Sequence, residues 1–501
     1  MAGRVGRGQR ALAAALALVA AGPATATNGY FSHGYSVAQR ALGGAGSAYA
    51  TDALAVSSNP ANLVYVPERF DLNLGLFVPQ RRYAASERGA GADAGIFTIE
   101  PGEVRSAREH FAIPALAYNH PADDRRSSWG IALYGNGGMN TDYRGHSARF
   151  AQNLPGFETQ CTGTFGGGEP VGGAADNAGF CGNGTDSAGV DLIQLFVVPS
   201  YAFKLGDAHA IGLAPIAAAQ RFTAKGLKAF ARFSNAPDKV SDNQYDYSFG
   251  AGYRLGVTST WFPYTTIGAS YQSRLDMTPF DKYAGLFAGE GDFDIPANWN
   301  AGIAFRLPWR QRLLFDYQKV YFDSIVPVGN PLNPNRFVNE CALPRLGGDD
   351  SPSDACLGSA SGPGFGWRDV TTRKFGYELA AGDLRLRAGY SKNDQPIPAA
   401  EVLFNVLAPG VPQEHYTAGL SYRVTRAWFL DLSLMYANNH PVRGKNPLSN
   451  STASPVELAA ALAVPGSVDT STAFGADPND QDLTLDMRQY ELMLGWSYLF
   501  D

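Results

Sequence analysis

Cysteine and histidine are the residue types whose chemistry is easiest to recognise from spacing. The chain has four cysteines and seven histidines. The histidines are scattered, and none belongs to a recognisable nucleophile motif; they are His33, His110, His120, His146, His209, His415 and His440. A lipase or protease needs a positioned nucleophile and base, so the sequence argues against an enzyme. No cysteine spacing resembles a zinc site, and the sequence predicts no metal and no cofactor.

The four cysteines fall into two local pairs, each in a segment rich in Gly, Asn and Asp. The pairs are Cys161 with Cys181 and Cys341 with Cys356. Four cysteines allow three connectivities. We favour the local pairing because each disulfide would then hold one long loop in an oxidising compartment. Four free thiols are the alternative.

Two groups of apolar side chains could bind a hydrophobic molecule. They lie in long connecting segments and fall near helical spacing: Phe222, Leu227, Phe230 and Phe233, then Phe280, Tyr283, Leu286 and Phe287. Exposed apolar clusters of this kind usually mark a binding surface. We interpret them as an outer groove, and the alternative is that the two segments pack on each other.

The first residues indicate how the chain is targeted. Arg4, Arg7 and Arg10 precede a short apolar run, Ala11–Ala21, and Ala24-Thr25-Ala26 has the form of a cleavage site. These features predict a secretory signal peptide over residues 1–26. The net charge of −6 becomes more negative without these arginines, which argues against nucleic acid as a partner.

Alternation of apolar and polar residues is the main signal in the rest of the chain. In the last strand, Leu492, Leu494 and Trp496 share one face, whereas Glu491 and Ser497 lie on the other. A mean hydropathy of −0.17 is compatible with membrane strands of this kind, because their average hydropathy is mild. Fourteen such segments are predicted: 69–82, 109–120, 128–137, 189–205, 209–221, 247–260, 264–275, 298–307, 312–323, 367–380, 383–393, 413–424, 427–437 and 484–500.

The connections between these segments alternate between short and long. Leu205-Gly206-Asp207 and Thr425-Arg426 are tight turns, whereas 138–188, 324–366 and 438–483 are long. Short periplasmic turns and long outer loops are typical of an outer-membrane barrel. The sequence therefore predicts an all-β transmembrane barrel of fourteen antiparallel strands over residues 68–501.

Residues 27–67 do not alternate and are rich in small side chains. Asp52 and Asn59 are placed as helix N-caps, and Pro60 suits the first helical position. About 40 residues of short helices and turns cannot form an independent domain. We therefore expect a small N-terminal helical hatch that plugs the barrel lumen.

Several short motifs, taken in order, resemble the FadL-type outer-membrane transport proteins. They are 28–35 (NGYFSHGY), 43–46 (GGAG), 59–61 (NPA), 134–140 (YGNGGMN), 291–296 (GDFDIP), 364–369 (GFGWRD) and 394–398 (DQPIP). The resemblance covers nearly the whole mature chain. It implies a fourteen-stranded barrel with an N-terminal hatch. It also implies passive transport of long-chain fatty acids or aromatic and aliphatic hydrocarbons from an outer groove to an inner pocket, then sideways through the wall.

The resemblance also suggests residues for each step. Gly135, Gly137 and Gly138 interrupt a strand, and glycine there marks a bulge or a close approach. In the family this is a wall kink that opens a lateral gap; an ordinary glycine turn is the alternative. The hatch residues Asn59, Pro60 and Ala61 would lie against the wall near this kink, and Tyr30 and Phe31 would border the inner pocket.

A carboxylate substrate needs a fixed cation in that pocket, and arginine binds carboxylates through two hydrogen bonds. Arg368 matches a basic family position, and Arg221 is a second candidate. A lumen salt bridge is the alternative for both.

Other functions and partners complete these expectations. A general porin or an adhesin is the alternative to a transporter, although a porin needs an open lumen. The expected location is the bacterial outer membrane, in contact with its lipid and lipopolysaccharide, after insertion by the barrel assembly machinery. We expect a monomer. The terminal Asp501 departs from the usual aromatic end of such barrels.

Overall fold

The computed structural model describes residues 27–87, 89, 95–144, 148–152, 187–464, 467–475 and 477–500. The predicted signal peptide, Cys161, Cys181 and Asp501 lie outside these residues. No helix within these ranges is long and apolar enough to cross a membrane.

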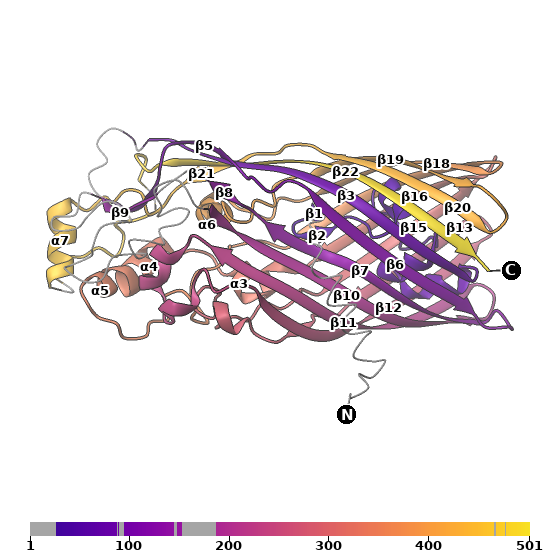
Figure 1. Cartoon of the computed structure of the whole chain (residues 1–501), viewed down its shortest axis with the longest axis horizontal. Helices are drawn as coiled ribbons and strands as arrows, with labels where there is room; N and C mark the ends of the chain where they lie inside the picture. The colour runs from indigo at the N-terminus through magenta and orange to yellow at the C-terminus, as the bar shows by residue number, and fades with distance from the viewer. Residues whose placement is uncertain are drawn as a thin grey trace, which may run out of the picture.

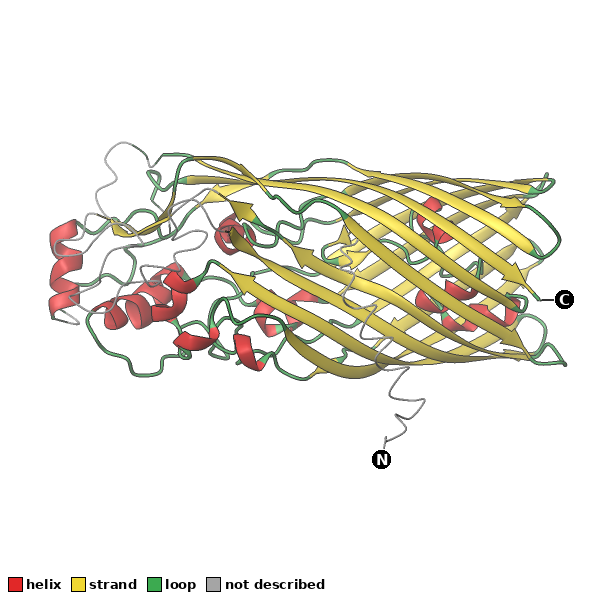
Figure 2. Ribbon diagram, in the orientation of Figure 1, coloured by secondary structure: helices red, strands yellow, loops and turns green. Residues whose placement is uncertain are grey.

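Fourteen long antiparallel strands in the described part of the chain close into a barrel (Figures 1 and 2). They are β3 (Arg69–Ala85), β6 (Phe111–Pro121), β7 (Ser127–Asn140), β10 (Ser187–Leu205), β11 (His209–Lys225), β12 (Asp246–Phe262), β13 (Thr265–Gln272), β15 (Asn298–Leu307), β16 (Gln311–Val320), β17 (Val370–Ala381), β18 (Leu384–Asn393), β19 (Glu414–Arg423), β20 (Trp428–Ala437) and β22 (Asp482–Leu499). β22 pairs with β3 from Leu483 to Leu499 and closes the ring. The predicted fold class is confirmed.

The alternation of side chains follows the two environments of the barrel wall. On β22, Leu494 is 54% exposed on the outer surface, whereas its neighbour Met493 is fully buried. Leu430 and Leu434 of β20 also point outward, whereas Phe429 faces the interior. An outer surface this apolar suits contact with lipid, because a strand places successive side chains on opposite faces.

Two predicted strand boundaries illustrate the differences: β11 runs on to Lys225 rather than ending at residue 221, and β17 starts late. The strand begins at Val370, although alternation suggests a start at residue 367. Trp367 is 1% exposed and packs against the ring of Tyr30. The chain therefore turns into the barrel before the strand begins.

Shorter elements occupy the loops and the interior. They are β1 (Thr27–Asn28), β2 (Phe31–Ser32), α2 (Val37–Ala41), η1 (Ala53–Ser57), η2 (Pro60–Tyr65), β4 (Gly95–Ile99), β5 (Gly102–Arg105), β8 (Tyr143–Arg144), β9 (Ala148–Gln152), η4 (Lys228–Phe233), η5 (Pro237–Lys239), β14 (Asp276–Met277), η6 (Asp281–Tyr283), η7 (Phe322–Ser324), α3 (Val326–Gly329), α4 (Pro334–Phe337), η8 (Val338–Ala342), α5 (Leu343–Leu346), η9 (Ala399–Glu401), α6 (Val402–Asn405), β21 (Val442–Lys445) and α7 (Pro455–Ala463).

The long loops gather at one end of the barrel, opposite the end where the chain finishes (Figure 1). Their helices α4, α5 and α7 lie farthest from the barrel (Figure 2). Cys341 and Cys356 form a disulfide within this region, which is the local pairing favoured from sequence. The bond ties η8 to the segment that follows α5.

Residues 27–67, which we call the N-terminal segment, lie inside the barrel (Figure 1). Helix α2 contacts β19 and β20, and η2 contacts β10, β11 and β12. Asp52 and Asn59 accept hydrogen bonds from Leu54 N–H and Ala61 N–H, both at 3.0 Å, so both predicted N-caps are confirmed. The helices that they begin are short 3₁₀ helices of five and six residues, which is about two turns each.

Buried charged groups join the N-terminal segment to the wall. Arg40 of α2 forms an ion pair with Glu491 of β22, and both side chains are almost fully buried. The Asp316 carboxylate on β16 accepts hydrogen bonds from Gly46 N–H and Ser47 N–H at 2.9 and 2.8 Å. Removing one member of a buried pair leaves the other charge uncompensated, so these contacts fix the segment in place.

Candidate substrate path

The ladder between β6 and β7 covers only part of the barrel height. It runs from Pro121 paired with Ser128 to Ala115 paired with Tyr134. β7 nevertheless continues along β10 as far as Asn140. In this described part of the wall, residues 111–114 of β6 and 135–140 of β7 therefore flank a gap.

A bulge in β7 lies at the start of this gap. Gln194 of β10 pairs with Gly137, whereas the next residue, Leu195, pairs with Gly135. Asn136 is the extra residue between these two pairs. Bulges bend a strand and increase its local twist. The structure thus places an irregularity at the glycines where the sequence suggests a wall kink.

The N-terminal segment covers the gap with its first residues. Phe31 pairs with Gly137, and Gly138 N–H donates a hydrogen bond to the Tyr30 carbonyl oxygen at 3.1 Å. A Cβ atom on Gly137 would lie 1.9 Å from that oxygen. Only glycine allows the two backbones to approach this closely. Tyr30 and Phe31 are each 1% exposed, and their rings lie 5.3 Å apart.

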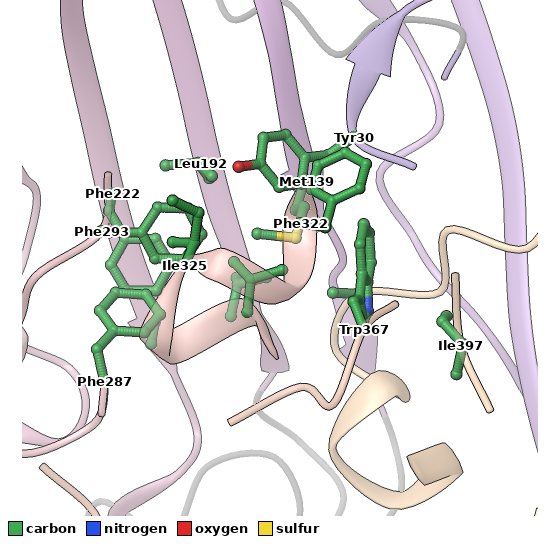
Figure 3. Packing of buried hydrophobic residues seen from close by; sticks show 14 of the residues in the cluster. Tyr30, Met139, Leu192, Phe222, Phe287, Phe293, Phe322, Ile325, Trp367 and Ile397 are labelled. Atoms are coloured by element: carbon green, nitrogen blue, oxygen red, sulfur yellow. The ribbon is translucent and has the colours of Figure 1, made fainter. Parts of the chain in front are cut away.

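A series of aromatic rings leads from this strand toward the loops (Figure 3). The ring of Tyr30 lies 6.3 Å from Phe293, and Phe293 lies 4.9 Å from Phe287. Phe287 in turn lies 4.6 Å from Phe222 at the outer end of β11. These distances fall within the usual range for aromatic pairs. The rings form one continuous apolar contact between the outer loops and the gap.

The outer end of this series borders an apolar groove with a cavity volume of about 70 Å³. Its lining is Phe97, Ile99, Val190, Phe222, Leu227, Phe230, Leu286, Phe287, Ala288, Pro327, Leu357, Pro363, Gly364, Phe365, Leu403, Phe404 and Leu407. Five of the eight side chains predicted for an outer groove belong to it, whereas Tyr283 lies outside the lining and packs edge-on against Phe222. Phe233 and Phe280 instead pack behind the groove, against Phe337 and Phe222.

The helical spacing predicted for these two clusters is not observed. Phe222 belongs to strand β11, and only residues 228–233 form a 3₁₀ helix. In the second cluster η6 covers only residues 281–283. The two clusters also contact each other through Phe222 and Phe287, as the alternative interpretation of the sequence expects.

A second, smaller cavity of about 20 Å³ lies beside the N-terminal segment. Its lining is Gly29, Tyr30, Arg81, Gly138, Met139, Asn140, Trp367, Ala408, Pro409, Gly410 and Met487. We call it the inner chamber. Leu407 lines the groove and Ala408 lines the chamber, so one loop borders both. The volume is enough for about one water molecule.

Arg81 brings a buried cation to the inner chamber. Its side chain is 5% exposed, and among the described residues it forms no ion pair and its Nη1 atom has no hydrogen-bond partner. The guanidinium lies 5.7 Å from the centre of the Phe111 ring at the edge of the gap. Sequence reasoning missed Arg81. The alternation that faces Asp71 and Asn73 inward also places Arg81 inward, which was the available signal.

The two arginines predicted for the inner pocket lie elsewhere. Arg368 is exposed, and its backbone N–H donates to the Pro396 carbonyl. Arg221 is buried and faces Asp191 at 3.6 Å, with its guanidinium 4.3 Å from the Tyr245 ring. Neither lines the inner chamber. Arg221 therefore fits the alternative interpretation of a lumen salt bridge.

The predicted hatch residues contact a different part of the wall from the kink. The Asn59 amide donates to Val257 O at 2.9 Å, and a Cβ on Gly212 would lie 2.3 Å from Ala61 N. Asn59, Pro60 and Ala61 thus pack on β11 and β12. The expected contact with the kink is made instead by Tyr30 and Phe31, whereas these three hatch residues contact the wall near the start of β11 and the end of β12.

Two carboxylates and an arginine hold the loop that carries Phe293. Asp294 forms an ion pair with Arg274 and accepts a hydrogen bond from Met277 N–H at 2.6 Å. Asp292 lies 3.8 Å from the same guanidinium. Burial and the neighbouring Asp294 raise the pKa of Asp292 to about 6. The loop is therefore held most firmly when Asp292 is protonated.

This arrangement predicts a pH-dependent opening of the Phe293 loop. Because the pKa of Asp292 is higher in the folded loop than in the open one, protonation stabilises the folded loop. This stabilisation is complete below the ordinary aspartate pKa and is lost as pH rises through about 6. We expect amide exchange at residues 291–295, corrected for intrinsic rates, to accelerate a few-fold from about pH 5 to 7, since solvent screens a half-exposed group. Asp292→Asn should abolish the change. An unchanged pH profile in that variant would contradict the assignment.

Sequence comparison finds little similarity to known proteins. No family model matches the chain. An uncharacterised protein from the 5′ region of the phosphoenolpyruvate carboxykinase gene of Chlorobium limicola is 49% identical over 55 residues, which is 11% of this chain and 27% of that protein. The chain thus matches only about a quarter of that relative.

Solved structures show similarity over almost the whole chain. The toluene transporter TodX of Pseudomonas putida covers 93% of this chain and 99% of its own, with 17% identity and a TM-score of 0.56. A Pseudomonas aeruginosa FadL homologue covers 94% and 100%, with 13% identity and a TM-score of 0.58. The Ralstonia pickettii toluene transporter TbuX covers 94% and 99%, with 17% identity and a TM-score of 0.52. The chain therefore has the fold of the FadL-type outer-membrane transporters.

Proposed function

We propose that the protein carries hydrophobic small molecules passively across the bacterial outer membrane. Long-chain fatty acids and aromatic or aliphatic hydrocarbons are the candidate substrates. A molecule enters the outer groove, follows the aromatic series to the inner chamber and leaves sideways between β6 and β7. The observation that carries this proposal is a gap in the β6–β7 ladder covered by the buried residues Tyr30 and Phe31.

The physical argument concerns what the substrate contacts at each step. Transfer of each CH₂ group from an apolar site into water costs about 0.8 kcal/mol. The groove, the rings and the lipid beside the gap all keep a substrate in apolar surroundings, so no energy source is needed. Unpaired backbone groups at membrane depth are costly. The N-terminal segment satisfies Gly138 N–H until a substrate displaces it.

The domain division follows from the same proposal. Residues 27–67 act as a hatch, residues 68–501 form the barrel, and residues 1–26 are the signal peptide removed on secretion. The apolar outer surface contacts membrane lipid and lipopolysaccharide after insertion by the barrel assembly machinery, and the chain works as a monomer. The lumen filled by the N-terminal segment argues against a general porin.

The direct test is uptake by cells that lack their own transporters of this type. We expect labelled oleate or toluene to enter faster when the chain is present, with no large steady ion current in planar bilayers. Unchanged uptake of both compounds would refute transport, and a porin-like current would refute a closed lumen.

Arg81 separates the two substrate classes in the same assay, and here it replaces Arg368 and Arg221 as the proposed carboxylate partner. If the substrate carries a carboxylate, Arg81→Met should reduce oleate uptake about tenfold at low concentration, which corresponds to about 1.4 kcal/mol. Toluene uptake should not change. Arg368→Met, at an exposed site, is the matched control and should behave as wild type.

A further inference from the structure

A third cavity lies at the end of the barrel opposite the long loops. Its volume is about 390 Å³, which is within the range of small-molecule sites. Residues 48–52 of the N-terminal segment border one side, and the short turn at Pro263 and Tyr264 borders another. We call this cavity the vestibule. It is separate from the groove and the inner chamber, since no lining residue is shared with either.

One wall of the vestibule carries a row of charged residues in direct register. Arg306 of β15 is opposite Arg312 of β16, Arg312 is opposite Glu378 of β17, and Glu378 is opposite Arg387 of β18. Arg385 lies two residues along β18 from Arg387 and lines the same cavity. This wall thus holds four arginines and one carboxylate, although the whole chain has a net charge of −6.

The carboxylate is fully engaged by the middle of the row. Glu378 accepts hydrogen bonds from Arg312 Nη1 at 2.7 Å and from Arg387 Nε at 2.9 Å. It also accepts one from the Tyr49 hydroxyl at 2.8 Å, and the Arg312 guanidinium lies 4.6 Å from the Tyr49 ring. These contacts fix Arg312 and Arg387 in position.

Arg306 and Arg385 are left without an acidic partner. Both are exposed to the cavity, and in the described ranges neither forms an ion pair. Like charges directly opposite on neighbouring strands destabilise a sheet, and Arg306 faces Arg312 in this way. Three acids also line the cavity: Asp71 is bonded to Arg69, Asp431 accepts from Ser421 and Asp52 accepts from Ser36, and in the described ranges none of them forms an ion pair with Arg306 or Arg385.

We propose that the vestibule binds an oxyanion, a carboxylate or a phosphate group, between Arg306, Arg312 and Arg385. A guanidinium fits both groups through paired hydrogen bonds, and such a ligand would compensate the two unpaired charges. The site shares no lining residue with the groove or the inner chamber, so it adds a polar ligand to a barrel whose outer groove is apolar. A free anion or the headgroup of a membrane phospholipid offers the same chemistry.

Equilibrium dialysis with labelled inorganic phosphate tests the site on the full chain in an uncharged detergent at low salt, where screening is weak. We expect saturable binding that weakens about tenfold in Arg306→Gln/Arg385→Gln, since two charge-assisted contacts are lost. Arg126→Gln, on an exposed turn outside the vestibule, is the matched control and should bind as wild type. Absence of saturable binding to wild type, or equal binding by the double variant, would overturn the proposal.

Further measurements distinguish a free anion from a lipid headgroup and keep the test valid if a variant misfolds. Competition by acetate indicates a free anion, whereas competition by phosphatidylglycerol nanodiscs, but not phosphatidylcholine ones, indicates a lipid headgroup. If the double variant does not fold, Arg385→Gln alone must still weaken binding about threefold, because one of the contacts remains. Oleate and toluene uptake should be unchanged in these variants, which separates this proposal from the transport proposal.

Discussion

Deletion of Asn136 should strongly reduce transport of hydrophobic molecules while leaving the barrel folded. Without the bulge residue, Gly135 and Gly137 become adjacent and pair with Leu195 and Gln194 in regular register. A straight β7 can then extend its ladder along β6, where the described pairing now stops at Ala115. A complete ladder closes the only lateral exit that the proposed path uses, and we expect uptake to fall by about tenfold or more, equivalent to 1.4 kcal/mol in an effective barrier.

A substitution at the same position provides the matched control. Asn136→Ala keeps the extra residue and removes only the side chain, which accepts from the Tyr35 hydroxyl and donates to Gln194, both at 2.9 Å. We expect this variant to retain most of its uptake. If the deletion variant folds, as judged by heat-modifiable migration, and still transports at the wild-type rate, the exit does not lie between β6 and β7. Equal loss in both variants would assign the effect to the side chain instead.

Gly137→Ala should have the opposite effect and open the gap without a substrate. The added methyl group would lie 1.9 Å from the Tyr30 carbonyl oxygen. Such an overlap cannot be relieved by a side-chain rotation, so the strand carrying Tyr30 must leave β7 and its hydrogen bond to Gly138 N–H is lost. We expect faster amide exchange at Gly138 and an increase of about fivefold or more in entry of a fluorescent hydrophobic probe, because the clash with a backbone oxygen offsets part of the stabilisation that holds the cover in place.

Ala217→Val is the control for added bulk. Ala217 is exposed on the outer face of β11, away from the N-terminal segment, so extra methyl groups there meet lipid. This variant should match wild type in both measurements. Unchanged exchange and unchanged probe entry in Gly137→Ala would show that Tyr30 and Phe31 are not the cover of the gap.

The fold could be predicted because a membrane barrel imposes a strict local pattern. Each wall strand has one face against lipid and one against the lumen, and residues such as Leu494 and Met493 report this directly. Helix caps are equally local, which is why Asp52 and Asn59 were assigned correctly. Strand β17 was predicted three residues too early because packing of Trp367 inside the barrel is a tertiary effect.

The candidate site was predicted less completely because it depends on register and on contacts between distant segments. Five groove residues belong to the apolar clusters predicted from sequence, but only one of the five, Phe230, lies in a helix. Arg368 was selected by motif position and is exposed. Alternation along β3 is enough to predict that Arg81 faces the lumen. Only its place in the lining of the inner chamber, together with Gly29 and Trp367, distinguishes it from other inward residues.

The pairing of the last strand with the first has a kinetic consequence for assembly. The ladder of hydrogen bonds between β22 and β3 can form only after the last strand has been made, since these two strands lie at opposite ends of the barrel sequence. The N-terminal segment precedes β3 and lies inside the finished ring, joined to β22 through Arg40 and Glu491. Its contact with β22 therefore forms at the same late stage as the closing ladder, because both need the last strand. Contacts of such high sequence separation form slowly. The N-terminal segment can therefore reach its final position at any time while the wall strands are folding.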